Sequence, residues 1–142
     1  MTMKRIVFSL MVMMISIFTY AQTDVVGKWK TIDDETGEEK SVVQIYKAKN
    51  GKYYGKIVSL TNPKKKNPLC EECEGAKKDQ PILGMLILEG LEKDGTDYSG
   101  GTITNPKDGA VYTCTIWREG NTLRVRGYIG WFFKTQTWIK AS

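Results

Sequence analysis

The chain contains no histidine, which removes the side chain that most often serves as a general base near neutral pH. The usual nitrogen ligand of zinc is missing too, and three cysteines fall short of the four ligands of a structural zinc site. The carboxylates lie mainly in polar turns, where water keeps their acidity ordinary. We therefore predict no metal, no cofactor and no catalytic site, with a carboxylate-pair or tyrosine-based enzyme as the alternative.

A large excess of charge is also lacking. The formal net charge of +5 includes Lys4 and Arg5, so the chain beyond them carries about +3. Its basic residues are scattered except at 64–66, which is expected to be a solvated loop, and the acidic residues around Gly37 lack the spacing of a calcium loop. This charge is too small to favour a nucleic-acid partner.

A long apolar run occurs once, at residues 6–18. Two basic residues precede it and a small-residue cleavage motif ending at Ala21 follows, an order typical of a secretory signal peptide. The run is shorter than the roughly 20 residues that cross a bilayer. We therefore expect residues 1–21 to be removed during export to the periplasm or beyond, and residues 22–142 to fold as one domain.

Beyond residue 22 the sequence lacks a sustained helical period. It consists of short β-rich runs separated by Gly, Asn, Asp and Pro, and Asn50-Gly51 is a strong hairpin signal. The expected strands are 27–32, 41–47, 52–60, 83–91, 98–104, 110–118, 122–129 and 134–140. About eight strands with short connections predict an all-β fold, a single antiparallel up-and-down β-barrel, with two packed sheets as the alternative.

Alternation along the strands predicts which side chains point into the barrel. Eight strands enclose a space that side chains fill or that holds one small ligand. Trp138 is assigned inward although Gln136 and Lys140 share its face. The residues expected to line the interior and contact a ligand are Tyr53, Ile57, Leu86, Leu88, Tyr112, Ile116, Val125 and Trp138.

One long connection, residues 61–81, contains the motif Cys70-Glu71-Glu72-Cys73. Export would place these thiols in an oxidising compartment, so we predict a disulfide between Cys70 and Cys73 that pins the connection. The alternatives are a redox pair, which normally begins a helix in a βαβ setting, and part of a metal site. Cys114 is predicted to be a small buried apolar residue.

Three large aromatic residues follow Gly130 at a position where a turn should be polar. One interpretation has them fold back as core or as a plug at one barrel end. In the other, Trp131, Phe132 and Phe133 form a lid over the cavity or an exposed contact for a partner or a membrane.

Gly27-Lys28-Trp29 resembles the G-x-W signature of lipocalins, in which the tryptophan plugs the barrel base beneath an arginine from a late strand. A longer ordered series, G-K-W-K-T-I-D-D-E-T-G, Y-G-K-I-V, C-E-E-C, D-Q-P-I-L-G-M, Y-S-G-G-T-I, V-R-G-Y-I-G and T-Q-T-W, resembles an exported bacterial family, domain of unknown function 2147, regarded as lipocalin-like. Asn105 stands where that family usually has Asp. The resemblance implies a lipocalin-like fold, export, and a base formed by Trp29 with Arg126 or Arg124, but no established activity.

Together these features predict an exported binding protein that holds a small apolar or amphipathic ligand in a barrel cavity, with tyrosine hydroxyls orienting its polar end. One alternative is an envelope protein interaction module whose barrel is filled by its own side chains. Another is a thiol-disulfide redox protein that uses Cys70 and Cys73. A peripheral contact with a membrane or an envelope protein is the further partner expected.

Overall fold

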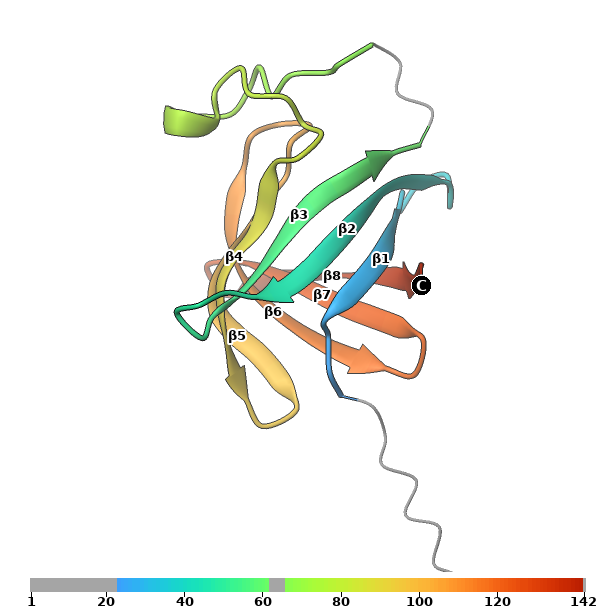
Figure 1. Ribbon diagram of the computed structural model, residues 1–142, viewed down its shortest axis with the longest axis vertical. Helices are drawn as coiled ribbons and strands as arrows, with labels where there is room; N and C mark the ends of the chain where they lie inside the picture. The colour runs from blue at the N-terminus through green and yellow to red at the C-terminus, as the bar shows by residue number, and fades with distance from the viewer. Residues whose placement is uncertain (1–22, 62–65, 142) are drawn as a thin grey trace, which may run out of the picture.

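The structure is a computed structural model that describes residues 23–61 and 66–141 (Figure 1). Eight antiparallel strands pair in sequence order, and β1 also pairs with β8 to close a barrel. The elements are β1 Gly27–Ile32, β2 Glu39–Lys47, β3 Tyr53–Leu60, the 3-10 helix η1 Gly75–Lys77, β4 Leu86–Asp94, β5 Asp97–Thr104, β6 Val111–Glu119, β7 Thr122–Ile129 and β8 Phe132–Lys140. The predicted up-and-down barrel is confirmed, and the two-sheet alternative is wrong. The predicted signal peptide lies outside the described residues.

Several strand boundaries differ from those expected by one to three residues, and the starts of β4 and β8 bear on the site. β4 begins at Leu86, three residues late, because Gly84 has a φ of +89° and its amide donates to the Ile57 carbonyl in a turn before the strand. β8 begins two residues early, at Phe132, which pairs with Ile129 across a tight turn. The aromatic residues at 132 and 133 therefore belong to a strand.

The strand connections define two ends of the barrel, since antiparallel neighbours place alternate connections at opposite ends. The β1–β2, β3–β4, β5–β6 and β7–β8 connections lie at one end, which we call the loop end. The long β3–β4 connection, with η1, lies there beside the β5–β6 turn (Figure 1). The opposite end we call the plugged end.

Trp29 closes the plugged end. Its side chain is fully buried, and its indole Nε1 donates to the Val25 carbonyl at 2.9 Å, which fastens the segment before β1 across the barrel. The Arg118 guanidinium lies 5.3 Å from the indole and donates to the Asp24 carbonyl at 3.0 Å. Lys140 approaches the same ring at 5.2 Å. Apolar burial and two cation–π contacts thus hold this end shut.

Large side chains fill the interior from the plugged end to the middle of the barrel. Tyr53 packs edge-on against Tyr98, with ring centroids 4.8 Å apart. The side chains packed there with no more than 2% of their surface exposed include Trp29, Val43, Ile45, Leu88, Leu91, Tyr98, Ile116, Leu123, Val125 and Trp138. A void large enough for water would expose their surfaces, so this part of the barrel is solid.

An irregularity in β4 changes one predicted inward position. Leu88 lies opposite Gly55, whereas Leu86 lies opposite Lys56, so β4 carries one extra residue at this point. Such a bulge reverses the alternation beyond it. Leu86 is half-buried while Met85 and Ile87 are buried, and the prediction that Leu86 points inward with Leu88 is wrong.

Two strand glycines provide a test of how tightly the sheet is packed. A Cβ at Gly101 would lie 2.3 Å from the Glu89 carbonyl oxygen, whereas one at Gly127 would meet its nearest atom, the Tyr112 Cβ, at 3.5 Å. Gly101→Ala should therefore lower the free energy of unfolding by about 2–3 kcal/mol through a backbone clash. Gly127→Ala, the matched control, should change it by less than about 1 kcal/mol. Urea unfolding of both variants measures the difference, and equal midpoints would contradict the close approach of β4 and β5.

Candidate functional site at the loop end of the barrel

Part of the inward face of the barrel is accessible at the loop end. Tyr112 lies opposite Ile103 and two residues beyond buried Cys114, so both side chains share the inward face. Gly127 lies opposite Cys114 and Gln136 opposite Val125 on the same face. Cys114 and Val125 are buried, whereas the other four residues on this face are half-buried. We call the four, Ile103, Tyr112, Gly127 and Gln136, the mouth of the barrel.

A polar group borders the mouth on the β8 side. Asp34, in the β1–β2 turn, accepts a hydrogen bond from Gln136 Nε2 at 3.3 Å and forms an ion pair with Lys134 Nζ at 3.0 Å. The hydrogen bond to Asp34, with the charges of the acidic turn, raises the pKa of Lys134. Lys134 lies opposite Gly127 and so is placed on the inward face, with 73% of its side chain exposed. The mouth therefore combines apolar walls with an exposed cation.

The β7–β8 turn projects aromatic side chains into solvent. Trp131, Phe132 and Phe133 are 85%, 63% and 60% exposed, and the interpretation that they fold back as core or plug is wrong. Trp131 stacks on Phe132 with centroids 4.3 Å apart. Phe132 pairs with Ile129 on the face that continues the mouth, whereas Phe133 pairs with Tyr128 on the outside. The residues are placed where a lid would be, and that role stays a prediction.

The long connection at this end is pinned by the predicted disulfide. Cys70 and Cys73 are joined, their Cα atoms 5.3 Å apart, and both are buried, which confirms the pairing. The Cys70 backbone exchanges hydrogen bonds with Gln80 and Asp79, so the two arms of the connection are also tied together. Cys70 is fully buried and Cys73 is 3% exposed, so a partner thiolate has little access to the sulfurs, which disfavours the redox interpretation.

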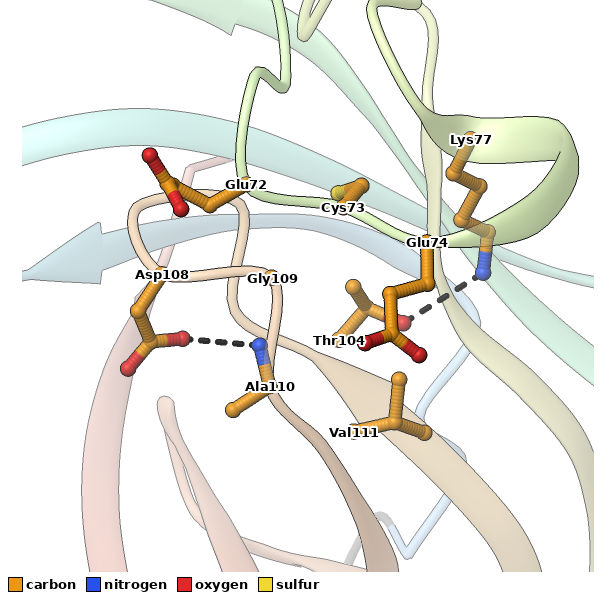
Figure 2. Close-up of a pocket in the computed structure, with 9 residues that line it drawn as sticks. All are labelled: Glu72, Cys73, Glu74, Lys77, Thr104, Asp108, Gly109, Ala110 and Val111. Atoms are coloured by element: carbon orange, nitrogen blue, oxygen red, sulfur yellow. Dashed lines mark hydrogen bonds between the residues drawn. The ribbon is translucent and has the colours of Figure 1, made fainter.

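A hollow of about 400 Å³ lies between the long connection and the β5–β6 turn (Figure 2). Gly109, with a φ of +73°, allows the two segments to meet, since a Cβ there would lie 2.0 Å from the Glu72 carbonyl oxygen. Lys77 points into the hollow and binds Glu89 and Thr104. A second hollow of about 330 Å³ lies beside Leu60 and Leu83. Neither hollow is lined by a predicted ligand-contacting residue, and the sequence offered only the C-x-x-C as a pointer to the first.

Arg126 does not lie at the barrel base. Its guanidinium is 4.9 Å from the Trp117 ring and 4.4 Å from the Phe133 ring on the outer surface, so its predicted role is wrong. Arg124 also points outward and binds Glu119. Both alternate with buried Leu123 and Val125, and a strand cannot place neighbours on one face. Arg118, at the rim of the inward face of β6, provides the cation over Trp29 instead.

Most of the predicted ligand-contacting residues belong to the packed core. Tyr112 lines the mouth, and Leu86 is half-buried opposite Lys56. The buried ones are Tyr53, Ile57, Leu88, Ile116, Val125 and Trp138. They lie beneath the accessible surface, and contact with a ligand stays a prediction for them.

The described residues offer neither a metal-binding group nor a membrane-spanning helix. Within 23–61 and 66–141, His, Cys, Asp and Glu side chains form no group suited to a metal ion. In the same part of the chain no helix has the length and apolar character needed to span a membrane.

A closed eight-stranded meander with a buried tryptophan under an arginine is a lipocalin-like barrel. A solved structure shares this fold: "Protein HP1028 from the human pathogen Helicobacter pylori belongs to the lipocalin family", with a TM-score of 0.73, 24% identity and 85% of each chain covered. The model of the family described as "Uncharacterized protein conserved in bacteria (DUF2147)" matches residues 27–140, and the chain belongs to this family. The comparison with curated proteins finds no match.

The assignment of Arg118 to the base can be tested against Arg126. Arg118→Gln removes the cation over Trp29 and the hydrogen bond to the Asp24 carbonyl, and should lower the free energy of unfolding by about 1–2 kcal/mol. Arg126→Gln, which removes an outer-surface cation, should cost less than about 1 kcal/mol. Thermal unfolding of both variants is the measurement. A larger loss for Arg126→Gln would restore the original assignment.

Cys114 should be unreactive in the folded protein. Burial raises the pKa of its thiol to about 12, so at pH 8 about one molecule in ten thousand carries the thiolate. A thiol reagent at pH 8 should label no cysteine in the native, non-reduced protein and one after unfolding in denaturant. Labelling of two or more cysteines after unfolding would contradict the Cys70–Cys73 pair, and rapid native labelling would contradict the burial of Cys114.

Proposed function

We propose that this protein is an exported, non-catalytic binding protein that holds a small amphipathic molecule in the loop-end half of its barrel. One observation carries the proposal: the inward side chains packed from the plugged end to the middle are buried, whereas those of the mouth, on β5 to β8, are only half-buried. An inward surface that stays partly accessible at one end of an otherwise solid barrel offers a partly apolar wall with a few polar groups, the composition typical of small-molecule sites.

The composition of the mouth supports an amphipathic guest. Ile103 and the aromatic face of Tyr112 offer apolar walls, continued toward solvent by Ile129 and Phe132. Polar groups lie on the other side, where Lys134 and the Gln136 amide approach Asp34. A molecule with an apolar body and a polar or anionic end would satisfy both parts.

Buried side chains would form the floor of this site. Cys114 and Val125 lie directly below the mouth, and Ile57 is buried at the same end of β3. Their packing restricts the guest to the loop-end half of the barrel, which favours a small molecule or the end of a longer one. The packed half at the plugged end also supports the second candidate, an envelope interaction module without a small ligand.

The proposal can be tested by filling the mouth. Gly127 leaves room above the Tyr112 Cβ and the Ile103 Cγ2, at 3.5 and 3.8 Å from a Cβ placed there. Gly127→Leu should therefore occupy the site and weaken binding of the fluorescent amphipathic probe anilinonaphthalene sulfonate by about tenfold or more. Thr115→Leu adds a similar side chain on the outer face of the neighbouring strand and should leave binding unchanged.

Native mass spectrometry of the processed protein isolated from its own host provides a second measurement. A co-purifying small molecule that is lost from Gly127→Leu and kept by Thr115→Leu is the expected result. If Gly127→Leu fails to fold, Phe132→Ala, a change at an exposed position, should still weaken binding of the probe. If no small molecule co-purifies and these substitutions leave probe binding unchanged, the interaction module with a filled barrel would be favoured.

A further inference from the structure

We propose that the tip of the β7–β8 hairpin docks the barrel on an anionic phospholipid surface. The tip consists of Ile129, Trp131, Phe132 and Phe133. This inference does not rest on a ligand in the mouth, because it is argued from the exposure of the turn and the charge of the outer face of β6, β7 and β8, although Ile129 and Phe132 also border the mouth.

The tip is an exposed apolar group at the apex of a hairpin. Ile129 is 62% exposed, and the three aromatic residues beside it are 60–85% exposed. Gly130, with a φ of +57°, makes the tight turn that brings these side chains together. Contiguous exposed aromatic residues mark a contact surface, and tryptophan prefers the interface between water and hydrocarbon.

Cations lie behind the tip on the outer face. Arg126 precedes Ile129 by three residues, or about 10 Å along an extended strand. Its guanidinium lies against the Phe133 ring at 4.4 Å and the Trp117 ring at 4.9 Å, and its Nε donates to Thr135 Oγ1. A cation set back by this distance from an inserted aromatic apex would lie at the level of the lipid phosphates.

The outer face of β6, β7 and β8 is otherwise poor in carboxylates. Among its outward positions Glu119 is the acidic residue, at the far end from the tip, and it binds Arg124 and the Trp117 indole. These hydrogen bonds lower the pKa of Glu119, so it remains a partner for Arg124. The charge next to the tip on this face is therefore positive and fits an anionic surface.

The acidic β1–β2 turn lies near the tip, and its charge is partly neutralised. Asp33 pairs with Lys40 at 2.7 Å, Asp34 pairs with Lys134 at 3.0 Å, and Glu39 pairs with Lys30 at 3.7 Å. Three of the five carboxylates at residues 33–39 thus have a lysine partner. Repulsion of lipid phosphates by this turn is reduced accordingly.

The shape of the tip favours a lipid surface over a protein partner. Trp131 is the most exposed of the aromatic residues and touches the Phe132 ring, so it forms an apex that a folded partner could receive only in a matching hollow. The headgroup layer of a bilayer is deformable and accepts such an apex without a preformed hollow.

The test uses vesicles of phosphatidylcholine alone and with about a quarter phosphatidylglycerol, a fraction that gives a negative surface potential. The protein is used without residues 1–21, since every strand, the disulfide and the packed core lie within residues 25–140. Co-sedimentation should show stronger binding to the anionic vesicles, weakened by salt. Brominated acyl chains should quench tryptophan fluorescence of the bound protein.

Matched variants separate the tip from other apolar surface. Trp131→Ser should reduce the vesicle-bound fraction at least about fivefold, because it removes the apex from the interface. Val111→Ser changes another exposed apolar residue, on β6, and should leave binding unchanged. Arg126→Gln should weaken binding to the anionic vesicles, and Arg126→Lys should retain it. Gly127→Leu, which fills the mouth, should bind vesicles as the unaltered protein does.

Three results would overturn the proposal. The first is no binding of the unaltered protein to anionic vesicles at low salt. The second is equal loss of binding in Trp131→Ser and Val111→Ser. The third is self-association that Trp131→Ser abolishes while vesicle binding persists, which would make the tip a contact between copies of the chain.

Discussion

The closure of the barrel between its first and last strands is the constraint on which the rest of the structure depends. The register between β1 and β8 covers two residue pairs, Trp29 with Lys140 and Lys30 with Ile139, whereas β7 and β8 share eight. Trp29 lies at this short seam, buried and bonded to the Val25 carbonyl beneath Arg118. An unpaired edge would leave backbone groups free to pair with other chains. Burial of one indole thus supports a closure that few backbone bonds provide.

Closure then divides the interior according to side-chain size. The plugged end receives Trp29, Trp138 and Tyr98, which fill the cross-section of an eight-stranded barrel. The inward positions nearer the loop end include Cys114 and Gly127, which are neighbours on β6 and β7 and have little side-chain volume. Small inward side chains fill this end of the barrel less completely, which leaves the side chains of the mouth partly accessible. This difference in volume explains why a solid core and an accessible inward surface occur in the same sheet.

The sequence predicted the strand number, the meander, the closed barrel and the disulfide, because turn residues and alternation are local signals. It misplaced Leu86, since the bulge opposite Gly55 depends on pairing with another strand. It also placed Arg126 at the base by resemblance, although alternation with Val125 already pointed this side chain outward. The mouth was unpredictable in detail, because accessibility depends on how side chains from four strands, β5 to β8, pack together. The hollow beside the disulfide depends on the contact between Glu72 and Gly109, which are far apart in the sequence.

The β7–β8 hairpin connects the two proposed surfaces through a simple property of a strand. Phe132 and Phe133 are consecutive and so face opposite sides, Phe132 with Ile129 toward the mouth and Phe133 with Tyr128 and Arg126 toward the outside. A surface that received Trp131 would therefore lie next to the apolar wall of the mouth. The two proposed surfaces therefore meet at Ile129 and Phe132, which belong to both. Lys134 pairs with Gly127, directly next to the Ile129–Phe132 pair on the same face, so its ion pair with Asp34 places charged groups beside this apolar wall.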